Sequence, residues 1–211
     1  MIILARHGQS TSNNITDDDF VTFEGDNLLT SVGESQAVDL ANSLLALSSP
    51  TIVSSPLVRA RATAEQICGI FDVDYEVAEP LAERYFNFES GVTGRQSRER
   101  QALAHQYPSN RIEGAESVVE FHERVSHWFD VFLRKFVAQS LTKSAVLVSH
   151  GGPIEVIMMH MLRIGADKIG KTAFRCDTGH MHVWRLRTFS PQLKLWSLEA
   201  ANVRAIDDYL D

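Results

Sequence analysis

Short apolar runs alternate with amphipathic stretches along the whole chain, and this alternation limits the folds open to it. The runs that we expect to form strands are 2–5, 51–54, 74–78, 145–148, 181–186 and 193–198. Apolar residues at helical spacing occupy 30–45, 55–70, 118–137 and 154–162. Strands alternating with helices predict an α/β fold, a three-layer αβα sandwich whose mostly parallel sheet carries helices on both faces.

The length of 211 residues suits one domain, and no repeat, low-complexity segment or linker marks a boundary. We therefore predict a single domain over 1–211. Two cysteines, Cys68 and Cys176, are too few for a disulfide framework and favour a reducing environment. No apolar stretch approaches the roughly 20 residues that span a bilayer, and the first residues do not form a signal peptide, so we expect a cytoplasmic protein.

The formal net charge of −7 restricts the partners of the chain. An acidic protein is a poor general binder of nucleic acids or of anionic membranes, and we expect neither as a partner. An anionic substrate must then be attracted by a local cluster of positive groups. The sequence does not reveal the oligomeric state.

Basic groups follow three of the predicted strands. The first strand ends in Arg6-His7-Gly8, Arg59 comes shortly after the second, and a later strand ends in Ser149-His150-Gly151-Gly152. Because ligands bind beyond the carboxyl ends of strands in such sheets, we expect two histidines and two arginines to converge. Arginine makes bidentate contacts to phosphate oxygens, and neutral imidazole can attack phosphorus. A glycine beside each histidine allows a ligand to approach the backbone. The pattern therefore indicates a phosphate site.

Ordered motifs along the chain resemble those of the histidine phosphatase superfamily, also called the phosphoglycerate mutase-like family. The first is the run from Arg6 to Asn13, and the others follow in the order expected of the family. These are Leu29-Thr30-x-x-Gly33-x-x-Gln36-Ala37, Ser55-Pro56-Leu57-x-Arg59-Ala60-x-x-Thr63-Ala64, Leu81-x-Glu83, Gly114-x-Glu116-Ser117 and Val148-Ser149-His150-Gly151-Gly152. The resemblance extends from residue 2 to about 155 and implies the phosphoglycerate mutase-like fold.

The resemblance also implies a role for each site residue. His7 would attack the phosphoryl group and become a phosphohistidine, while Glu83 would protonate the leaving oxygen and later activate water. The phosphate oxygens would be surrounded by Arg6, Asn13, Arg59, His150 and Gly151, with His150 charged in the complex. These groups supply the charge stabilisation, so we expect no metal and no cofactor.

Several positions have alternatives. Asn13 could be only a turn residue, Arg61 competes with Arg59, and Glu79, Glu89 or Arg84 compete with Glu83. Glu116 is expected to tie a helix start to the site, and Ser117 to cap that helix. A metal hydrolase built on the remaining histidines (His122, His127, His180 and His182) lacks an acidic cage or a His-Glu-x-x-His pattern.

The sequence departs from the mutases of the family. Only 32 residues separate Glu83 from Glu116, which suggests the compact phosphatase arrangement, and Asn87 replaces a common glycine. The loop after Asn13 is acidic at Asp17, Asp18, Asp19, Glu24 and Asp26. It would repel a carboxylate-bearing bisphosphate unless it points outward as a solvated lid.

A cap or specificity insertion is expected around 84–115. It carries a basic stretch that could overhang the crevice or form a solvated helical face: Arg84, Arg95, Arg98, Arg100 and Arg111. Tyr85, Phe86 and Phe88 could line a wall for the leaving group.

Three functions follow from this reading. The favoured one is a metal-independent phosphatase of the histidine acid phosphatase type, which hydrolyses phosphomonoesters of small molecules or of phosphoproteins through His7. The alternatives are a cofactor-dependent mutase-like phosphotransferase and a non-catalytic phosphate-binding module. The proton donor Glu83 argues against the last, because binding alone needs none.

Overall fold

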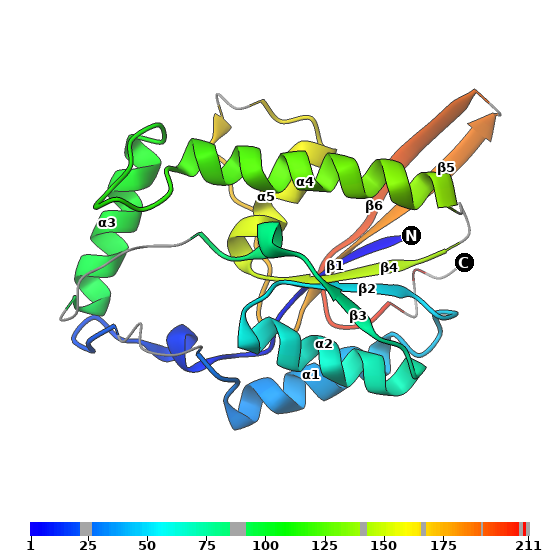
Figure 1. Cartoon of the computed structure of the whole chain (residues 1–211), viewed down its shortest axis with the longest axis horizontal. Helices are drawn as coiled ribbons and strands as arrows, with labels where there is room; N and C mark the ends of the chain where they lie inside the picture. The colour runs from blue at the N-terminus through cyan, green and yellow to red at the C-terminus, as the bar shows by residue number, and fades with distance from the viewer. Residues whose placement is uncertain are drawn as a thin grey trace.

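A six-stranded sheet forms the centre of the part of the chain that the computed structural model describes, which is residues 1–21, 27–84, 92–139, 143–165, 168–190, 192–206 and 209. The strands are β1 (Ile2–Arg6), β2 (Thr51–Ser54), β3 (Tyr75–Val77), β4 (Ala145–Ser149), β5 (Met181–Ser190) and β6 (Leu193–Val203). Their order is β3-β2-β4-β1-β5-β6 (Figure 1). The first four run parallel, whereas β5 pairs antiparallel with β1, and β6 pairs antiparallel with β5.

Helices cover both faces of this sheet, which confirms the predicted three-layer α/β fold. One face carries α1 (Ser31–Ser43) and α2 (Val58–Phe71), and the other carries α4 (Val118–Gln139) and α5 (Gly151–Met161) (Figure 1). The helix α3 (Gly94–Gln106) stands apart from both layers, beyond one end of the sheet. Short 3₁₀ turns, η1 (Thr11–Asn14) and η2 (Glu79–Leu81), follow β1 and β3.

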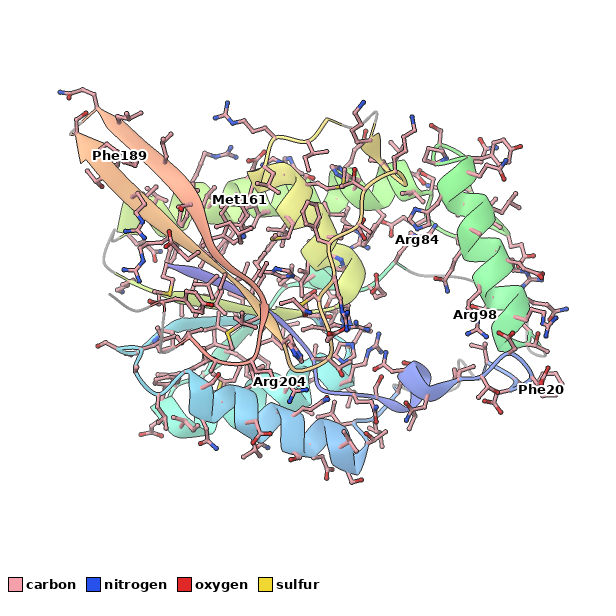
Figure 2. All side chains as sticks on the ribbon, turned by 180° about the vertical axis from the view of Figure 1, so that it is seen from behind. Phe20, Arg84, Arg98, Met161, Phe189 and Arg204 are labelled. Atoms are coloured by element: carbon pink, nitrogen blue, oxygen red, sulfur yellow. The ribbon has the colours of Figure 1, made fainter. Side chains whose placement is uncertain are left out.

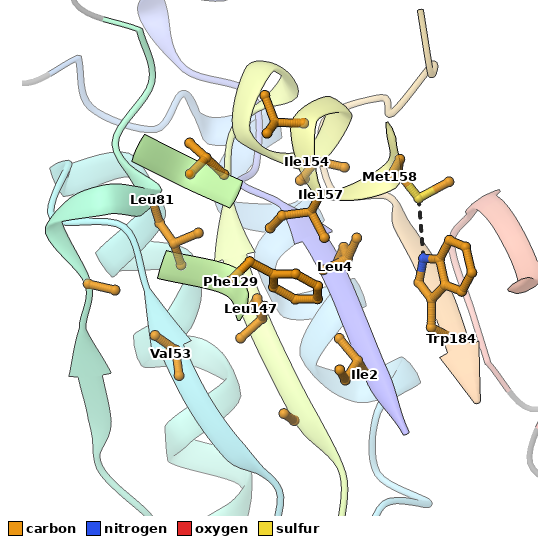
Figure 3. Packing of buried hydrophobic residues seen from close by; sticks show 14 of the residues in the cluster. Ile2, Leu4, Val53, Leu81, Phe129, Leu147, Ile154, Ile157, Met158 and Trp184 are labelled. Atoms are coloured by element: carbon orange, nitrogen blue, oxygen red, sulfur yellow. Dashed lines mark hydrogen bonds between the residues drawn. The ribbon is translucent and has the colours of Figure 1, made fainter. Parts of the chain in front are cut away.

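The strand β1 is apolar at consecutive positions because each of its faces meets a helical layer. Ile3 and Ala5 pack in the cluster beneath α1 and α2, whereas Ile2 and Leu4 pack in the cluster beneath α4 and α5. Figure 3 shows the second cluster around Phe129. All five residues are fully buried, and burial of one such side chain of Leu or Phe size contributes about 1.5–3 kcal/mol. These two cores hold the central strands, and therefore the strand ends, in fixed positions.

Local signals explain where the helices begin. Thr30 caps α1 by accepting a hydrogen bond from the Gly33 N–H at 3.1 Å. Ser117 and Glu120 form a reciprocal pair at the start of α4. The expected starts of two other helices were wrong. The helix α5 begins at Gly151 rather than at 154, because Pro153 fits within a first helical turn; α2 begins at Val58, after Pro56.

The C-terminal strands are longer than expected and form a hairpin whose end projects from the body (Figure 1). Their buried residues are concentrated at one end of the hairpin, and Phe189 near the turn is exposed (Figure 2). The apolar runs at 181–186 and 193–198 cover only part of each strand. The sequence therefore does not predict the remaining part of β5 or of β6. Among the described helices, none is long and apolar enough to cross a membrane.

Candidate active site

The carboxyl ends of β1, β2 and β4 lie side by side and bring the predicted site residues together. Backbone pairing continues just past the strands, since the His7 N–H donates to the Ser149 carbonyl and the Ser55 N–H to the Val148 carbonyl. A cavity of about 950 Å³ opens there. Its lining includes Arg6, His7, Asn13, Arg59 and Glu83. His150 is buried directly beneath this lining, with its ring centroid 4.9 Å from that of His7.

The hydrogen bonds of His7 fix its tautomer. Its Nδ1 lies 2.6 Å from the carbonyl oxygen of Gly8, which can only accept, so Nδ1 carries the proton. Its Nε2 lies 3.2 Å from Nε of Arg59, which can only donate, so Nε2 holds a lone pair. Burial is the largest cause that lowers the pKa of His7 to about 3, and the Arg59 and Arg6 charges add to it. His7 is therefore neutral, with the lone pair of Nε2 available for attack on phosphorus.

His150 is also held by its neighbour across the sheet. Its Nε2 lies 2.7 Å from Oγ of Ser55, and that hydroxyl accepts a hydrogen bond from the Leu57 N–H. If the Ser55 hydroxyl donates its own proton to His150 Nε2, both groups are satisfied and the proton of the ring lies on Nδ1. Nδ1 is buried without a partner in the described part of the chain. Burial, then His7, Arg59 and Arg6, lower the pKa of His150 far below its usual value, so we assign it as neutral without ligand.

The two arginines are positioned by separate contacts. Arg6 ends β1 and donates from Nη1 to the Cys176 carbonyl oxygen at 2.7 Å. Arg59 lies in the first turn of α2, one turn before Thr63, whose hydroxyl donates to the Arg59 carbonyl oxygen. The same hydroxyl accepts a hydrogen bond from the Gly8 N–H at 3.1 Å. Thr63 therefore couples the loop of His7 to the helix of Arg59.

Gly8 has a packing role that the sequence did not reveal. A Cβ at Gly8 would overlap the carbonyl group of Gly33 at the start of α1. We expected this glycine to let a ligand approach the backbone, but here it lets one segment of the protein approach another. The loop after β1 is thus packed directly against α1.

Asn13 shapes the turn after β1 and also lines the cavity. Its Oδ1 accepts hydrogen bonds from the backbone and the hydroxyl of Ser10, at 2.8 and 3.0 Å, so the residue shapes the turn. It also lines the cavity. Because Oδ1 is committed to Ser10, the donor Nδ2 is the atom left for an anion.

Glu83 lies in the cavity wall between η2 and α5. Its Oε2 accepts a hydrogen bond from the Gly152 N–H at 3.2 Å, and its Oε1 accepts one from the Arg84 N–H at 2.9 Å. Its competitor Glu79 is exposed in η2 and does not line the cavity. The other competitor, Arg84, lines the cavity and is buried, at 7% exposure.

Glu116 ties α4 to the segment that precedes Glu83, close to its expected role. Its carboxylate pairs with Arg124 of α4 at 2.7 Å. Arg124 also donates to the carbonyl oxygens of Pro80 and Ala82, at 2.8 and 3.4 Å. The Glu83 segment is thereby anchored to the helical layer.

The acidic loop docks on α3 instead of being only a solvated lid. Asp17 pairs with Arg98 and, at 3.6 Å, with Arg95. The Gly94 N–H donates to the Asp19 carbonyl oxygen at 2.9 Å, and the Arg95 N–H donates to that of Asp17. Figure 2 shows Phe20 and Arg98 close together at this end of α3. The charges of two cap arginines are therefore partly compensated by the loop.

The other members of the basic stretch have separate partners. Arg100 pairs with Glu113 at 2.9 Å, and Arg111 pairs with Glu120. Both pairs are partly exposed, so this side of the cap is a solvated face. Of the basic stretch, Arg84 and Arg98 line the cavity.

Three titratable residues that belong to none of the motifs also line the cavity. These are His105 of α3, His122 of α4 and Glu155 of α5. Glu155 could have been noticed as a single charge within an apolar helical segment.

The remaining histidines do not form a metal site. Among the described residues, no group of three or more His, Cys, Asp or Glu side chains could hold a metal ion. His182 is buried in the sheet, His127 is exposed, and His180 accepts a hydrogen bond from Arg204 at 3.2 Å. The predicted roles of Tyr85, Phe86, Asn87, Phe88, Glu89, Glu24 and Asp26 fall on residues outside the described part of the chain.

Three of the solved structures that share this fold are phosphatases by name. The mycobacterial glucosyl-3-phosphoglycerate phosphatase in complex with VO3 matches with a TM-score of 0.75 and 22% identity, over 95% of this chain and 98% of that one. The α-ribazole phosphatase from Shigella flexneri matches with a TM-score of 0.76 and 21% identity, over 97% and 96%. A phosphoserine phosphatase mutant from Entamoeba histolytica in complex with phosphoserine matches with a TM-score of 0.71 and 23% identity, over 96% of each chain.

Sequence comparisons give the family. A search of curated protein sequences finds no match. The family model of the histidine phosphatase superfamily (branch 1) matches residues 2–199, which is nearly the whole chain. The ordered motifs, the sheet and the paired histidines at its strand ends agree with that match, and the chain belongs to the histidine phosphatase superfamily.

Proposed function

We propose that the protein is a phosphatase that hydrolyses phosphomonoesters through a phosphohistidine intermediate on His7. The observation that carries this proposal is the fixed tautomer of His7, which leaves the Nε2 lone pair beside Arg59 at the cavity wall. A ring with a pKa near 3 stays unprotonated throughout the physiological pH range. Phosphate binding alone needs no such lone pair, since a proton donor would serve an anion better.

The first step transfers the phosphoryl group to the protein. Nε2 of His7 attacks phosphorus, the bond from phosphorus to the ester oxygen breaks, and Glu83 gives its proton to that oxygen. Before this attack, the Arg59 Nε–H must release His7 Nε2 and donate to a phosphate oxygen instead. Arg6 and Nδ2 of Asn13 bind the other oxygens, and the Nδ1 proton of His150 is the remaining donor within this cluster.

The second step restores the enzyme. Glu83, now a carboxylate, takes a proton from a water molecule as that water attacks phosphorus, and the bond between phosphorus and Nε2 breaks. Inorganic phosphate leaves and Glu83 is protonated again. The arginines and histidines supply the charge stabilisation, so this scheme uses no metal.

The surroundings of the site support a small phosphorylated substrate or a phosphorylated side chain. A cavity of about 950 Å³ has the size of a small-molecule site. The arginines at its base concentrate positive charge in a chain whose net charge is −7, and such local fields attract anions. The pairing of Asp17 with Arg95 and Arg98 reduces the charge available to a second anionic group, which favours hydrolysis over a mutase reaction on a bisphosphate.

The test is a panel of phosphomonoesters assayed with a metal chelator present. We expect the native protein to release phosphate and His7→Ala to lose at least about 10³-fold in kcat/KM, as removal of a nucleophile does elsewhere. Acid-quenched native protein should contain phosphohistidine at His7. The control is Arg61→Ala, an exposed residue of α2 bonded to Tyr75, which should keep native activity.

Two results would overturn the proposal. One is hydrolysis by folded His7→Ala at the native rate, and the other is loss of native activity on chelation. Interconversion of phosphoglycerates that depends on added bisphosphoglycerate, without net phosphate release, would establish the mutase alternative instead.

A further inference from the structure

The cavity extends past Glu83 to α5, where Glu155 forms part of the wall. Glu155 lies one helical turn after Gly152, whose N–H holds the Glu83 carboxylate. It is the single charged residue within a segment whose other members are buried and apolar. These are Ile154, Val156, Ile157, Met158 and Met159. The packing of α5 on the sheet explains those residues but does not explain a carboxyl group at 155.

Glu155 is half-buried and has no protein partner. Among the described residues, no hydrogen bond or ion pair is made by its carboxyl group. Burial, followed by the nearby charge of Glu83, raises the pKa of Glu155 to about 7. A partly desolvated carboxylate without a donor is unfavourable, and a hydrogen-bond donor supplied by a ligand would remove that penalty.

The neighbouring wall has the features of a leaving-group pocket. Phe121 of α4 reaches Gly152, because a Cβ there would lie 3.0 Å from its Cζ. The adjacent His122 lines the same cavity, and its Nε2 is buried without a partner in the described chain. An apolar ring therefore lies beside the Gly152 that holds Glu83, and His122 adds an unsatisfied polar atom to the wall of the same cavity.

We propose that Glu155 determines specificity by accepting a hydrogen bond from a hydroxyl or ammonium group of the alcohol that leaves the phosphate. This inference rests on the proposed phosphatase function and names the substrate class for the same site. The donor must lie within a few bonds of the ester oxygen, because Glu155 lies one helical turn after Gly152, whose N–H binds Glu83. A leaving group with a carboxylate at that position is disfavoured, because the Glu155 carboxylate would repel it.

The test compares esters that differ only in the donor: 2-aminoethyl and 3-hydroxypropyl phosphate against ethyl and propyl phosphate. We expect native kcat/KM for at least one donor ester to exceed that of its alkyl match by about tenfold or more, as for a hydrogen bond to a charged group. In Glu155→Ala this preference should fall to within about twofold, while the alkyl esters stay within about threefold of native. Glu99→Ala, an exposed residue of α3, is the control and should keep the native preference.

Glu155→Gln separates the two kinds of donor. Its amide oxygen still accepts from a hydroxyl but carries no charge for an ammonium group, so rescue of the hydroxypropyl ester alone identifies a hydroxyl substrate. An unchanged preference in Glu155→Ala, or an equal loss on all four esters, overturns the proposal. If the native protein hydrolyses none of them and none of the phosphomonoester panel, the phosphatase function fails. The role of Glu155 is then decided by calorimetric binding of the same esters to native protein and Glu155→Ala.

Discussion

Gly152 lies where the backbone of α5 meets the carboxyl group of Glu83. A Cβ at this position would overlap Glu83 Oε1, and the flexible carboxyl group would move before the helix does. Gly152→Ala should therefore lower kcat for alkyl phosphates by about 10- to 100-fold, because their leaving oxygen needs a proton. Hydrolysis of p-nitrophenyl phosphate should fall by less than about threefold, since its leaving group is stable as an anion. Steady-state kinetics on the two esters measures the difference.

The control for this substitution is Gly69→Ala. Gly69 is exposed in α2, and a Cβ there meets nothing within 4 Å. Both esters should be hydrolysed at native rates by this variant. Equal losses on the two esters in Gly152→Ala would show that the substitution disturbs the whole site and not the proton donor.

The sequence predicts which side chains meet in the site only where those side chains directly follow a strand. His7, Arg59 and His150 follow strands, so the parallel sheet alone brings them together. The tautomer of His7 depends on the Gly8 carbonyl and on Arg59, which are contacts that a sequence does not show. Glu155 belongs to none of the motifs. The one sequence feature that points to it as a site residue is its position as a lone charge in an apolar helical segment.

At the level of elements, Arg124 joins α4 to the segment that carries Glu83. The Arg124 side chain is 28% exposed, and its guanidinium group binds Glu116 and two backbone carbonyl oxygens. Arg124→Ala leaves these acceptors without their donor, so we expect about 2–3 kcal/mol loss in the free energy of unfolding. We also expect a lower kcat on alkyl phosphates. Urea unfolding and steady-state kinetics measure the two effects.

Arg111→Ala is the matched control, because it removes an arginine from a more exposed pair with Glu120 near the start of the same helix. Such pairs contribute little, and we expect neither the free energy of unfolding nor kcat to change measurably. Equal effects of the two substitutions would contradict an anchoring role for Arg124.

The helices differ in how well their own sequences predict them. The apolar stripe of α4 is complete within the element, so its range was predicted closely at 118–137 against Val118–Gln139. In contrast, α3 has few apolar residues and buries mainly small side chains such as Ala104. Its start is set by a capping box of Thr93 and Gln96 and by docking of the acidic loop. These contacts come from the tertiary structure, so the sequence alone indicates only a basic stretch in this segment.

For the whole molecule, the order of strands and helices was enough to predict a parallel sheet with two helical layers. What it could not give is the position of α3, because that helix packs beyond the sheet and its partner loop lies far away in the sequence. The Asp17 and Arg98 pair spans 81 residues. Opposite charges were visible in both segments, but each had a plausible alternative as a solvated surface.

The burial of neutral histidines should make stability depend on pH. Burial is the largest cause that lowers the pKa values of His7, His105, His122, His150 and His182. The unfolded chain therefore binds more protons than the folded one below pH 6.5, and the free energy of unfolding falls as the pH falls. Glu155 acts in the opposite sense, because its pKa rises from 4.5 to about 7 on folding.

The contribution of His7 can be isolated by substitution. With a pKa of 6.5 unfolded and about 3 folded, His7 alone should lower the free energy of unfolding by about 2 kcal/mol between pH 7.5 and pH 5. His7→Asn should lose this part of the decrease, whereas His127→Asn, at an exposed position of α4, should retain it. Urea titrations at the two pH values give the difference. Identical pH dependence in native protein and His7→Asn would mean that His7 is not held neutral by the fold, and the assignment of Nε2 as the attacking atom would lose its physical basis.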